Sequence, residues 1–331
     1  MPCTHLFNLH NQQLNSMRLR IHYLQLLMAA VVALAVTSCD DSSNLSILDP
    51  DINFDGTNEN KNDASKDAYL SQLQFPKVRG GSSEVIHHTS SDIGLNYSIE
   101  WDHELRAQRW TCYTFNASNS IQKWSRNNWY NTSWGGDPFQ LDPLVPIVEQ
   151  PAVSGEFWGS HYPGTVRGYD RGHICASQDR VCSQQANEQT FYMTNMMPQV
   201  NSFNAGIWAQ MEIAVRDKWN RSNFRDVLYV VKGGTIDKQS QILAHTTNGF
   251  IVPRYFFMAV LCKNGSQYKG MAFWVEHLNE DHSTDPLNQY VVSIDRLEQL
   301  TGIDFFCNLP DDIEQEVESA TRAKIMSDWN L

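Results

Sequence analysis

The chain has 331 residues, of which 41% are hydrophobic and 19% are charged, so it can bury a sizeable core in one or two domains. This composition excludes a disordered or collagen-like protein. The chain contains no run of about 20 apolar residues, which also excludes a polytopic membrane protein. The 25 Lys and Arg against 37 Asp and Glu give a formal net charge of −12, which at first argues against a nucleic-acid partner.

The amino-terminal segment has the layout of an export signal. Two arginines precede an apolar stretch from Leu24 to Val36, which is too short for a comfortable membrane-spanning helix. Small residues and then Cys39 follow, an arrangement that resembles the bacterial lipobox, in which cleavage precedes a cysteine that becomes acylated. We therefore expect residues 1–38 to be a signal peptide that truly starts at Met17, with an uncleaved signal anchor as the alternative.

A polar segment follows the proposed cleavage point. Residues 40–67 are rich in Asp, Asn and Ser and contain few large apolar side chains. Such a segment cannot bury enough surface to offset its ordering entropy, so it predicts a disordered tether. We assign the lipidated Cys39 and this acidic tether to residues 39–80 and the folded domain to residues 81–325. The protein is then expected to be lipid-anchored in the bacterial cell envelope, with the outer membrane or cell surface as candidate locations.

The folded part combines strand-like and helical patterns. Runs rich in β-branched and aromatic residues predict strands, and apolar residues at helical spacing predict helices. The expected strands are 109–115, 189–193, 227–231, 255–261, 270–274 and 290–293, and the expected helices are 204–220, 295–301 and 311–320. These elements favour an α+β fold with a mixed, largely antiparallel central sheet flanked by helices.

Five cysteines remain beyond the proposed lipidation site: Cys112, Cys175, Cys182, Cys262 and Cys307. In an oxidising compartment some of them could pair. Cys175 and Cys182 are close enough in sequence for a disulfide, and Cys262 with Cys307 is a further option. A zinc site that uses His173 with Cys175 and Cys182 is a weaker alternative, because the Cys-x-x-Cys clasp and a fourth ligand are missing.

The segment Asp170-Arg171-Gly172-His173 contains the first chemical signal. On an extended strand, residues two apart share a face, so Arg171 and His173 can point into one site. An arginine offers a bidentate fork to a phosphate, and a histidine can accept a proton near neutral pH. Together they are the minimum equipment for hydrolysing a phosphodiester bond.

The expected helix 204–220 contains the second signal. Four of its side chains are spaced by four residues and drift by only about 40° per step, so they form one stripe. They are Asn204, Trp208, Glu212 and Arg216. An amide oxygen at Asn204, with a carboxylate two turns later, suits a hydrated hard cation beside a phosphate.

Together these motifs resemble the DNA/RNA non-specific endonuclease family of the ββα-metal (His-Me finger) class, which includes sugar-non-specific bacterial nucleases and mitochondrial endonuclease G. The Asp-Arg-Gly-His signature is followed at family-like spacing by Thr194 to Gln199 and then by the stripe on the helix. The resemblance covers about residues 84–318 and implies a two-strand-plus-helix metal motif packed on the sheet. Ile174 departs from the pattern, since many members have Gln there, and Cys175 and Cys182 are not general family features.

The resemblance implies a role for each matched residue. His173 corresponds to the general base, Asn204 to the direct Mg²⁺ ligand, with Mn²⁺ as a substitute, and Glu212 to a carboxylate that reaches the metal through water. Arg126, Arg171 and Arg216 correspond to cations that hold the phosphate. Arg126 and Arg171 also offset charge in the transition state. The implied reaction cleaves DNA, RNA or both to 5′-phosphate ends.

Each of these roles has a structural alternative. His173 could be a satisfied structural histidine, Asn204 could only cap its helix, and Glu212 with Arg216 could be a surface ion pair. Trp208 is expected in the core. The alternative function is an inactive nucleic-acid- or protein-binding module on the same scaffold, but the intact His173, Asn204 and Glu212 argue against it. The sequence leaves a homodimer open.

The acidic net charge is unevenly distributed along the chain. Residues 276–318 contain 12 acidic residues and one basic residue, and residues 39–67 contain eight acidic and two basic residues. The stretch between these segments contains the motifs and is slightly basic. Because electrostatic attraction is screened beyond about 10 Å, local charge matters more than the total, and the net charge no longer excludes nucleic acid.

Overall fold

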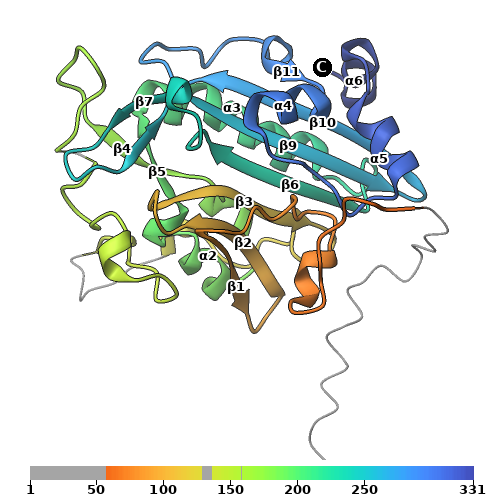
Figure 1. Ribbon diagram of the computed structural model, residues 1–331, viewed down its shortest axis with the longest axis horizontal. Coiled ribbons are helices and arrows are strands. Elements are labelled where there is room, and N and C mark those ends of the chain that lie inside the picture. The colour runs from red at the N-terminus through yellow and green to blue at the C-terminus, as the bar shows by residue number, and fades with distance from the viewer. Residues whose placement is uncertain (1–56, 129–135, 158) are drawn as a thin grey trace, which may run out of the picture. The chain divides into compact units, whose positions relative to one another are not determined.

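The computed structural model describes residues 57–128, 136–157 and 159–331 (Figure 1). Its centre is a seven-stranded sheet in the order β1-β2-β3-β6-β9-β10-β11, with every neighbouring pair antiparallel. The strands are β1 (Ser83–Ser90), β2 (Gly94–Asp102), β3 (Ala107–Phe115), β6 (Val227–Gly234), β9 (Tyr255–Asn264), β10 (Gln267–Glu276) and β11 (Val291–Val292). This architecture confirms the predicted α+β fold with a largely antiparallel sheet.

Helices cover both faces of β9 and β10. Figure 1 shows α4 (Ile294–Thr301) and α5 (Asp311–Glu318) on the near face and α3 (Ala209–Ile213) on the far face. Side chains alternate along β9, so Phe257 packs against Phe305 on one side while Phe256 packs against Trp208 on the other. In the described residues the other α-helices are α2 (Gln184–Gln189) and α6 (Arg322–Trp329).

Local sequence signals account for the boundaries of α4. The Ser293 hydroxyl accepts a hydrogen bond from the backbone N–H of Arg296 at the start of the helix. Gly302 ends it in the left-handed conformation, with φ of 79°, which costs a glycine little. The predicted helices 295–301 and 311–320 therefore correspond to α4 and α5.

A smaller unit is built from β4 (Tyr169–His173) and β5 (Met196–Val200), which pair antiparallel and place Arg171 opposite Pro198. A helical segment follows from Phe203 to Trp219, with a kink at Gly206, where φ is −95° and ψ is −117°. We call it the site helix. It consists of the π-helical segments η8 (Phe203–Trp208) and η9 (Ala214–Trp219) with α3 between them. The order strand, strand, helix is the one that the resemblance implied. A second pair, β7 (Ile242–His245) with β8 (Ile251–Pro253), lies outside the main sheet.

The prediction of a strand at 189–193 is wrong. Gln189 is the last residue of α2, residues 190 and 191 form a turn, Met193 begins a short 3-10 helix, and β5 begins only at Met196. Phe191 and Met193 are fully buried there, 1% and 0% exposed, so the short apolar run reflects burial in a turn rather than strand structure.

Residues 57–80 pack against the domain, which contradicts their assignment to a disordered tether. Phe75 is fully buried, the Asn58 amide donates to the carbonyl oxygen of Leu309 at 2.5 Å, and the Asn62 amide donates to that of Pro76 at 3.0 Å. Amide side chains thus replace water at backbone carbonyls, an interaction that hydropathy does not reveal. At the other end Trp329 is also fully buried, so the folded unit extends beyond the predicted boundary at 325.

The predicted signal peptide, Cys39 and the first part of the tether lie outside the described residues. In the described part of the chain, no helix is both long enough and apolar enough to cross a membrane.

Neither candidate disulfide is formed: Cys112, Cys175, Cys182, Cys262 and Cys307 are all free and buried. The Cys262 thiol donates to the carbonyl oxygen of Phe224 at 3.5 Å, whereas the Cys307 thiol donates to that of Phe75 at 3.7 Å. Each of these two thiols therefore has its own partner in the core. No described cluster of metal-ligating side chains combines His173 with Cys175 and Cys182, so the zinc alternative has no support.

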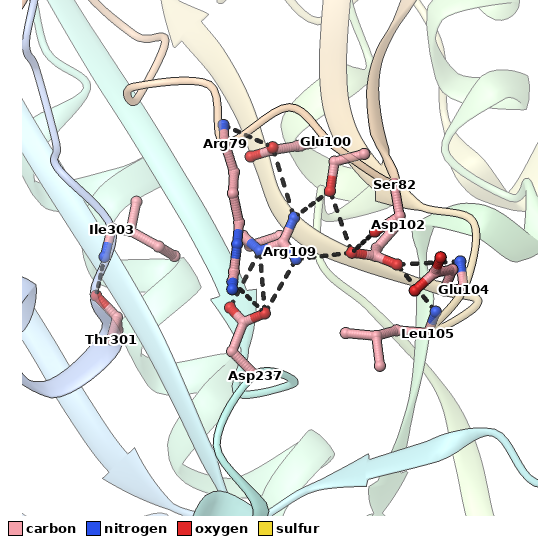
Figure 2. A network of polar contacts seen from close by, with 11 residues as sticks. Arg79, Ser82, Glu100, Asp102, Glu104, Leu105, Arg109, Asp237, Thr301 and Ile303 are labelled. Atoms are coloured by element: carbon pink, nitrogen blue, oxygen red, sulfur yellow. Dashed lines mark hydrogen bonds and ion pairs between the residues drawn. The ribbon is translucent and has the colours of Figure 1, made fainter.

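A buried polar network ties the first strands of the sheet to the loop after β6 (Figure 2). Arg109 on β3 is 3% exposed and donates to Asp102 on β2 at 2.9 Å and to Asp237 at 3.0 Å. Arg79 completes the arrangement, with its guanidinium 2.5 Å from Asp237 and its backbone N–H donating to Glu100 at 2.9 Å. We call this group the Arg109 network.

Candidate active site

All six residues predicted for the site line one pocket of about 480 Å³, which we call the site pocket. The strand β4 supplies one wall and the site helix supplies another, and the turn Arg126–Asn128 contributes an exposed arginine. The six residues are Arg126, Arg171, His173, Asn204, Glu212 and Arg216.

Gly172 explains why the strand can lie so close to its partner. A Cβ atom at this position would be 2.3 Å from the side chain of Gln199 on β5, which is fully buried. A larger residue would therefore push β4 away from β5 and displace the side chains on either side of it. The glycine in the motif serves the placement of Arg171 and His173.

Asp170 ties the strand to the start of the site helix. Its Oδ2 accepts hydrogen bonds from the Nδ2 atoms of Asn201 and Asn204, both at 2.9 Å. Asn204 lies inside the helical segment and does not cap it, so the capping alternative is not observed. Because Nδ2 of Asn204 is used by Asp170, its Oδ1 remains as the acceptor that the amide offers.

The three arginines of the site pocket are held to different degrees. The Arg171 guanidinium donates to Asp137 at 2.8 Å and lies 3.6 Å from the centre of the Phe139 ring. Arg216 pairs with Asp179 at 3.0 Å. Arg126 is exposed, and among the described residues its guanidinium has an aromatic contact, 5.7 Å from the Phe191 ring centre. The three arginines are thus partly fixed and partly adjustable.

His173 lies between two aromatic rings, with centroid distances of 5.5 Å to Phe139 and 5.2 Å to Phe191. Its Nε2 is buried and has no hydrogen-bond partner among the described residues, so it is not a satisfied structural histidine. Burial, followed by the positive charges of Arg126, Lys232 and Arg171, lowers the pKa of His173 to about 3. The imidazole is therefore neutral at pH 7.

Glu212 pairs with Lys232, a residue that the sequence reasoning missed. Lys232 on β6 is fully buried, and its Nζ lies 2.5 Å from Oε1 of Glu212 and 5.0 Å from the Trp208 ring centre. Burial raises the pKa of Glu212, and the Lys232 ammonium opposes that rise. The surface pair between Glu212 and Arg216 is not recorded, since each has another partner. A single lysine directly after the apolar run 227–231 was the available signal.

Asn195 and Trp208 fix the backbone around the site. Asn195 accepts from the backbone N–H of Cys175 at 2.8 Å and donates to its carbonyl oxygen at 2.9 Å. Trp208 is 1% exposed, as expected for a core residue, and its indole N–H donates to the carbonyl oxygen of His173 at 3.3 Å. The helix and both strands are therefore fixed around the catalytic histidine candidate.

The comparisons with known proteins agree with this geometry. The family described as DNA/RNA non-specific endonuclease matches residues 86–312. A nuclease from Nostoc sp. is 32% identical over 226 residues, which covers 66% of this chain and 78% of the relative. The nuclease of Serratia marcescens is 25% identical over 240 residues, with coverages of 72% and 82%.

A mitochondrial relative and a solved structure extend the comparison. The human mitochondrial nuclease EXOG is 26% identical over 266 residues, covering 76% of this chain and 64% of that protein. A crystal structure of the EndoG/EndoGI complex contains a chain with the same fold, at a TM-score of 0.55 and 18% identity, covering 74% of this chain and 94% of the other. With its fold, its motifs and the family match over most of its length, this chain belongs to the DNA/RNA non-specific endonuclease family.

Proposed function

We propose that this endonuclease is magnesium-dependent and hydrolyses phosphodiester bonds in DNA, RNA or both, leaving 5′-phosphate ends, with His173 as the general base. The observation that carries the proposal is the neutral imidazole of His173, which lines a pocket together with three arginines and two carboxylates. A base that is already deprotonated, next to cations that attract phosphate, is the arrangement that phosphodiester hydrolysis requires.

His173 would take a proton from the attacking water. Its low pKa keeps the imidazole neutral at pH 7, so one ring nitrogen has a lone pair that can accept the proton. The resulting hydroxide attacks phosphorus, the bond to the 3′-oxygen breaks, the 3′-oxygen takes a proton from solvent, and the phosphate stays on the 5′ side. A bound phosphate also offsets the positive charges of Arg126 and Arg171, so we expect the pKa of His173 to rise in the complex and make it a stronger base.

The arginines would bind the phosphate and stabilise the charge that develops on it. Asp137 and the face of the Phe139 ring already orient Arg171, so its side chain loses little conformational entropy when it binds the phosphate. Arg126 is exposed and can turn onto the substrate. Arg216 is partly neutralised by Asp179, which suits a role in positioning more than in attraction.

The donors in the site pocket fit a hard divalent cation. Asn204 offers Oδ1 because Asp170 holds its Nδ2, and the carboxylates of Asp170 and Glu212 line the same pocket. Mg²⁺ usually keeps several water ligands and needs few protein oxygens, and Mn²⁺ can substitute for it. The ion would supply positive charge to the phosphate and to the departing 3′-oxygen. Glu212, kept in place by Lys232, would accept a hydrogen bond from a water beside Asn204.

Digestion assays test this function directly. The detergent-solubilised full chain should cut plasmid DNA or RNA with Mg²⁺ and should stop when EDTA is added. His173→Ala should lower the rate by about 10²–10⁴-fold, the usual contribution of a general base, whereas His245→Ala, an exposed histidine outside the site pocket, should not. Undiminished cutting by His173→Ala would refute the mechanism, and cutting in EDTA would refute the metal dependence.

We also propose that the protein is exported and lipid-anchored through Cys39. The support is the sequence alone, namely the apolar stretch that ends in small residues before this cysteine. Mass spectrometry of the mature amino terminus should find an acylated Cys39, and Cys39→Ser should release the protein from the membrane fraction. An unmodified amino terminus upstream of Cys39 would contradict the proposal.

A further inference from the structure

A second hollow lies directly beside the site pocket, and we call it the side hollow. It measures about 530 Å³, within the range of about 300–1,000 Å³ that small-molecule sites occupy. It shares Gln178, Ile213 and Arg216 with the site pocket, so the two form one continuous groove along the site helix. The helix continues along the side hollow with Asp217 and Asn220.

The two parts of the groove differ in charge. The site pocket has three arginines against the carboxylates of Asp170 and Glu212, which favours a phosphate. The side hollow has Arg216 against Asp179 and Asp217, and both carboxylates already pair with that arginine, at 3.0 and 3.4 Å. An anionic group would meet excess negative charge in the side hollow, so this part of the groove suits an uncharged group.

Two side chains shared by both parts are free to contact such a group. Ile213 is 40% exposed, so its apolar side chain can contact a group in the groove. Gln178, from the turn Ser177–Arg180, makes no side-chain hydrogen bond with the residues that the structure describes. By contrast, Ser120 and Asn220 at the base of the hollow bond to each other at 3.0 Å.

We propose that the side hollow binds the nucleoside next to the cleaved phosphate, with Ile213 packed against the base and the Gln178 amide bonded to the base edge. The inference rests on the proposed endonuclease function and specifies its substrate as a polynucleotide that extends beyond the scissile bond. An amide both donates and accepts, so it can serve the edge of any base and gives little base discrimination. The apolar contact with Ile213 likewise does not distinguish one base from another.

The test compares two substrates of the full chain. A long single-stranded oligonucleotide fills the side hollow, whereas bis(nitrophenyl) phosphate offers a phosphodiester without a neighbouring nucleoside. Ile213→Ala and Gln178→Ala should each raise KM for the oligonucleotide by about three- to tenfold and leave kcat nearly unchanged, the pattern of lost ground-state binding. Hydrolysis of the small ester should stay within about twofold of wild type.

Matched controls separate a subsite from a general effect on packing. Ile213→Leu keeps the apolar contact and should retain wild-type KM. Val148→Ala removes a more exposed apolar side chain, 82% exposed, outside both hollows and should change nothing. Equal losses on both substrates would overturn the proposal, because Ile213 would then support the site pocket itself. Unchanged kinetics on the oligonucleotide would overturn it as well.

A binding measurement removes the dependence on turnover of the small ester. In a His173→Ala background, Ile213→Ala should weaken the affinity for a fluorescent oligonucleotide by about three- to tenfold, and equal affinities would refute the subsite. Failure of the wild-type protein to cut any nucleic acid would refute the proposed function. If the wild-type protein cuts nucleic acid but Ile213→Ala and Gln178→Ala have wild-type kinetics, only the proposal for the side hollow is refuted.

Discussion

Arg109 and Arg171 show how the same side chain serves two different ends. In the Arg109 network two arginines face three carboxylates, from Asp102, Asp237 and Glu100, and the group is closed within the protein (Figure 2). Arg171 lies instead in a pocket where arginines outnumber carboxylates. Removing a buried arginine whose carboxylate partners lie within the protein destabilises the fold, whereas charge left in excess at a pocket is available to a phosphate.

The histidines divide in the same way. His277 is 1% exposed and bonds through both ring nitrogens, to the backbone N–H of Val200 at 2.8 Å and to the carbonyl oxygen of Pro253 at 3.0 Å, whereas Nε2 of His173 has no partner in the described part of the chain. A buried polar atom without a partner costs free energy, and such a cost is tolerated where function requires it. The site pocket is therefore expected to serve activity at a cost in stability, whereas the Arg109 network is expected to serve stability.

Breaking the Arg109 network should give the largest loss of stability. Arg109→Ala leaves the carboxylates of Asp102 and Glu100 buried without their cation, which typically costs about 3–5 kcal/mol of unfolding free energy. Urea denaturation should report this loss, while the activity of the remaining folded protein should stay near wild type. Arg171→Ala is the matched change in the site pocket and should lose activity with a much smaller change in stability. Equal effects of the two variants on stability would remove the distinction.

Lys232→Met should lower both stability and activity, because this lysine belongs to the site and to the core. Without the ammonium, Glu212 stays buried and uncompensated, which should cost about 1–3 kcal/mol of stability and shift the acid limb of the pH–rate profile to higher pH. The double variant Lys232→Met with Glu212→Gln should recover stability without recovering activity. Recovery of activity as well would show that Glu212 takes no part in the reaction.

Lys232 also illustrates what the sequence could and could not predict. The motif residues are neighbours on β4 or on the site helix, so local spacing placed them correctly. Lys232, Asp137 and Asp179 join them only through the fold, and no local period links a strand residue to a helix far along the chain. Long-range polar pairs are specified by packing of whole elements, and single-sequence patterns do not contain that information.

The fold shows the same limit. The central strands β6, β9 and β10 are long apolar runs and were predicted, whereas β1 and β2 were missed because their polar residues mask the pattern. Residues 57–80 were taken for tether because their order depends on amide side chains such as that of Asn58, which bonds to the distant carbonyl oxygens of Cys307 and Leu309. Composition measures how much apolar surface a segment has, and it does not measure these hydrogen bonds.

The pH dependence of stability should separate His173 from the Arg109 network. The pKa of His173 is about 3 in the folded protein against 6.5 for an ordinary histidine, so below pH 6.5 the unfolded chain binds a proton that the folded protein does not. Stability should fall as pH decreases from about 6.5 toward 3. Burial opposes the shift in Asp102, but hydrogen bonds from Leu105 and Arg109 lower its pKa to about 2, so its contribution is lost only below about pH 4.

Denaturation at several pH values measures this difference. His173→Ala should flatten the decline between about pH 6.5 and pH 4, since the titrating group is gone. Asp102→Asn should lower stability at neutral pH and reduce only the loss at the acid extreme. An unchanged slope between pH 6.5 and pH 4 in His173→Ala would show that the imidazole titrates normally in the folded protein.

The smallest effect is expected for Arg126, whose guanidinium is exposed and is the least constrained of the three in the site pocket. Arg126→Ala should leave unfolding free energy within about 0.5 kcal/mol of wild type, because surface substitutions rarely do more. Binding of an oligonucleotide to a His173→Ala background should weaken and lose about one unit of salt dependence, as for one phosphate contact. Arg167→Ala, an exposed arginine outside the site pocket, controls for the lost charge. Equal salt dependence in the two variants would place Arg126 outside the phosphate path and leave Arg171 and Arg216 as the phosphate-binding cations.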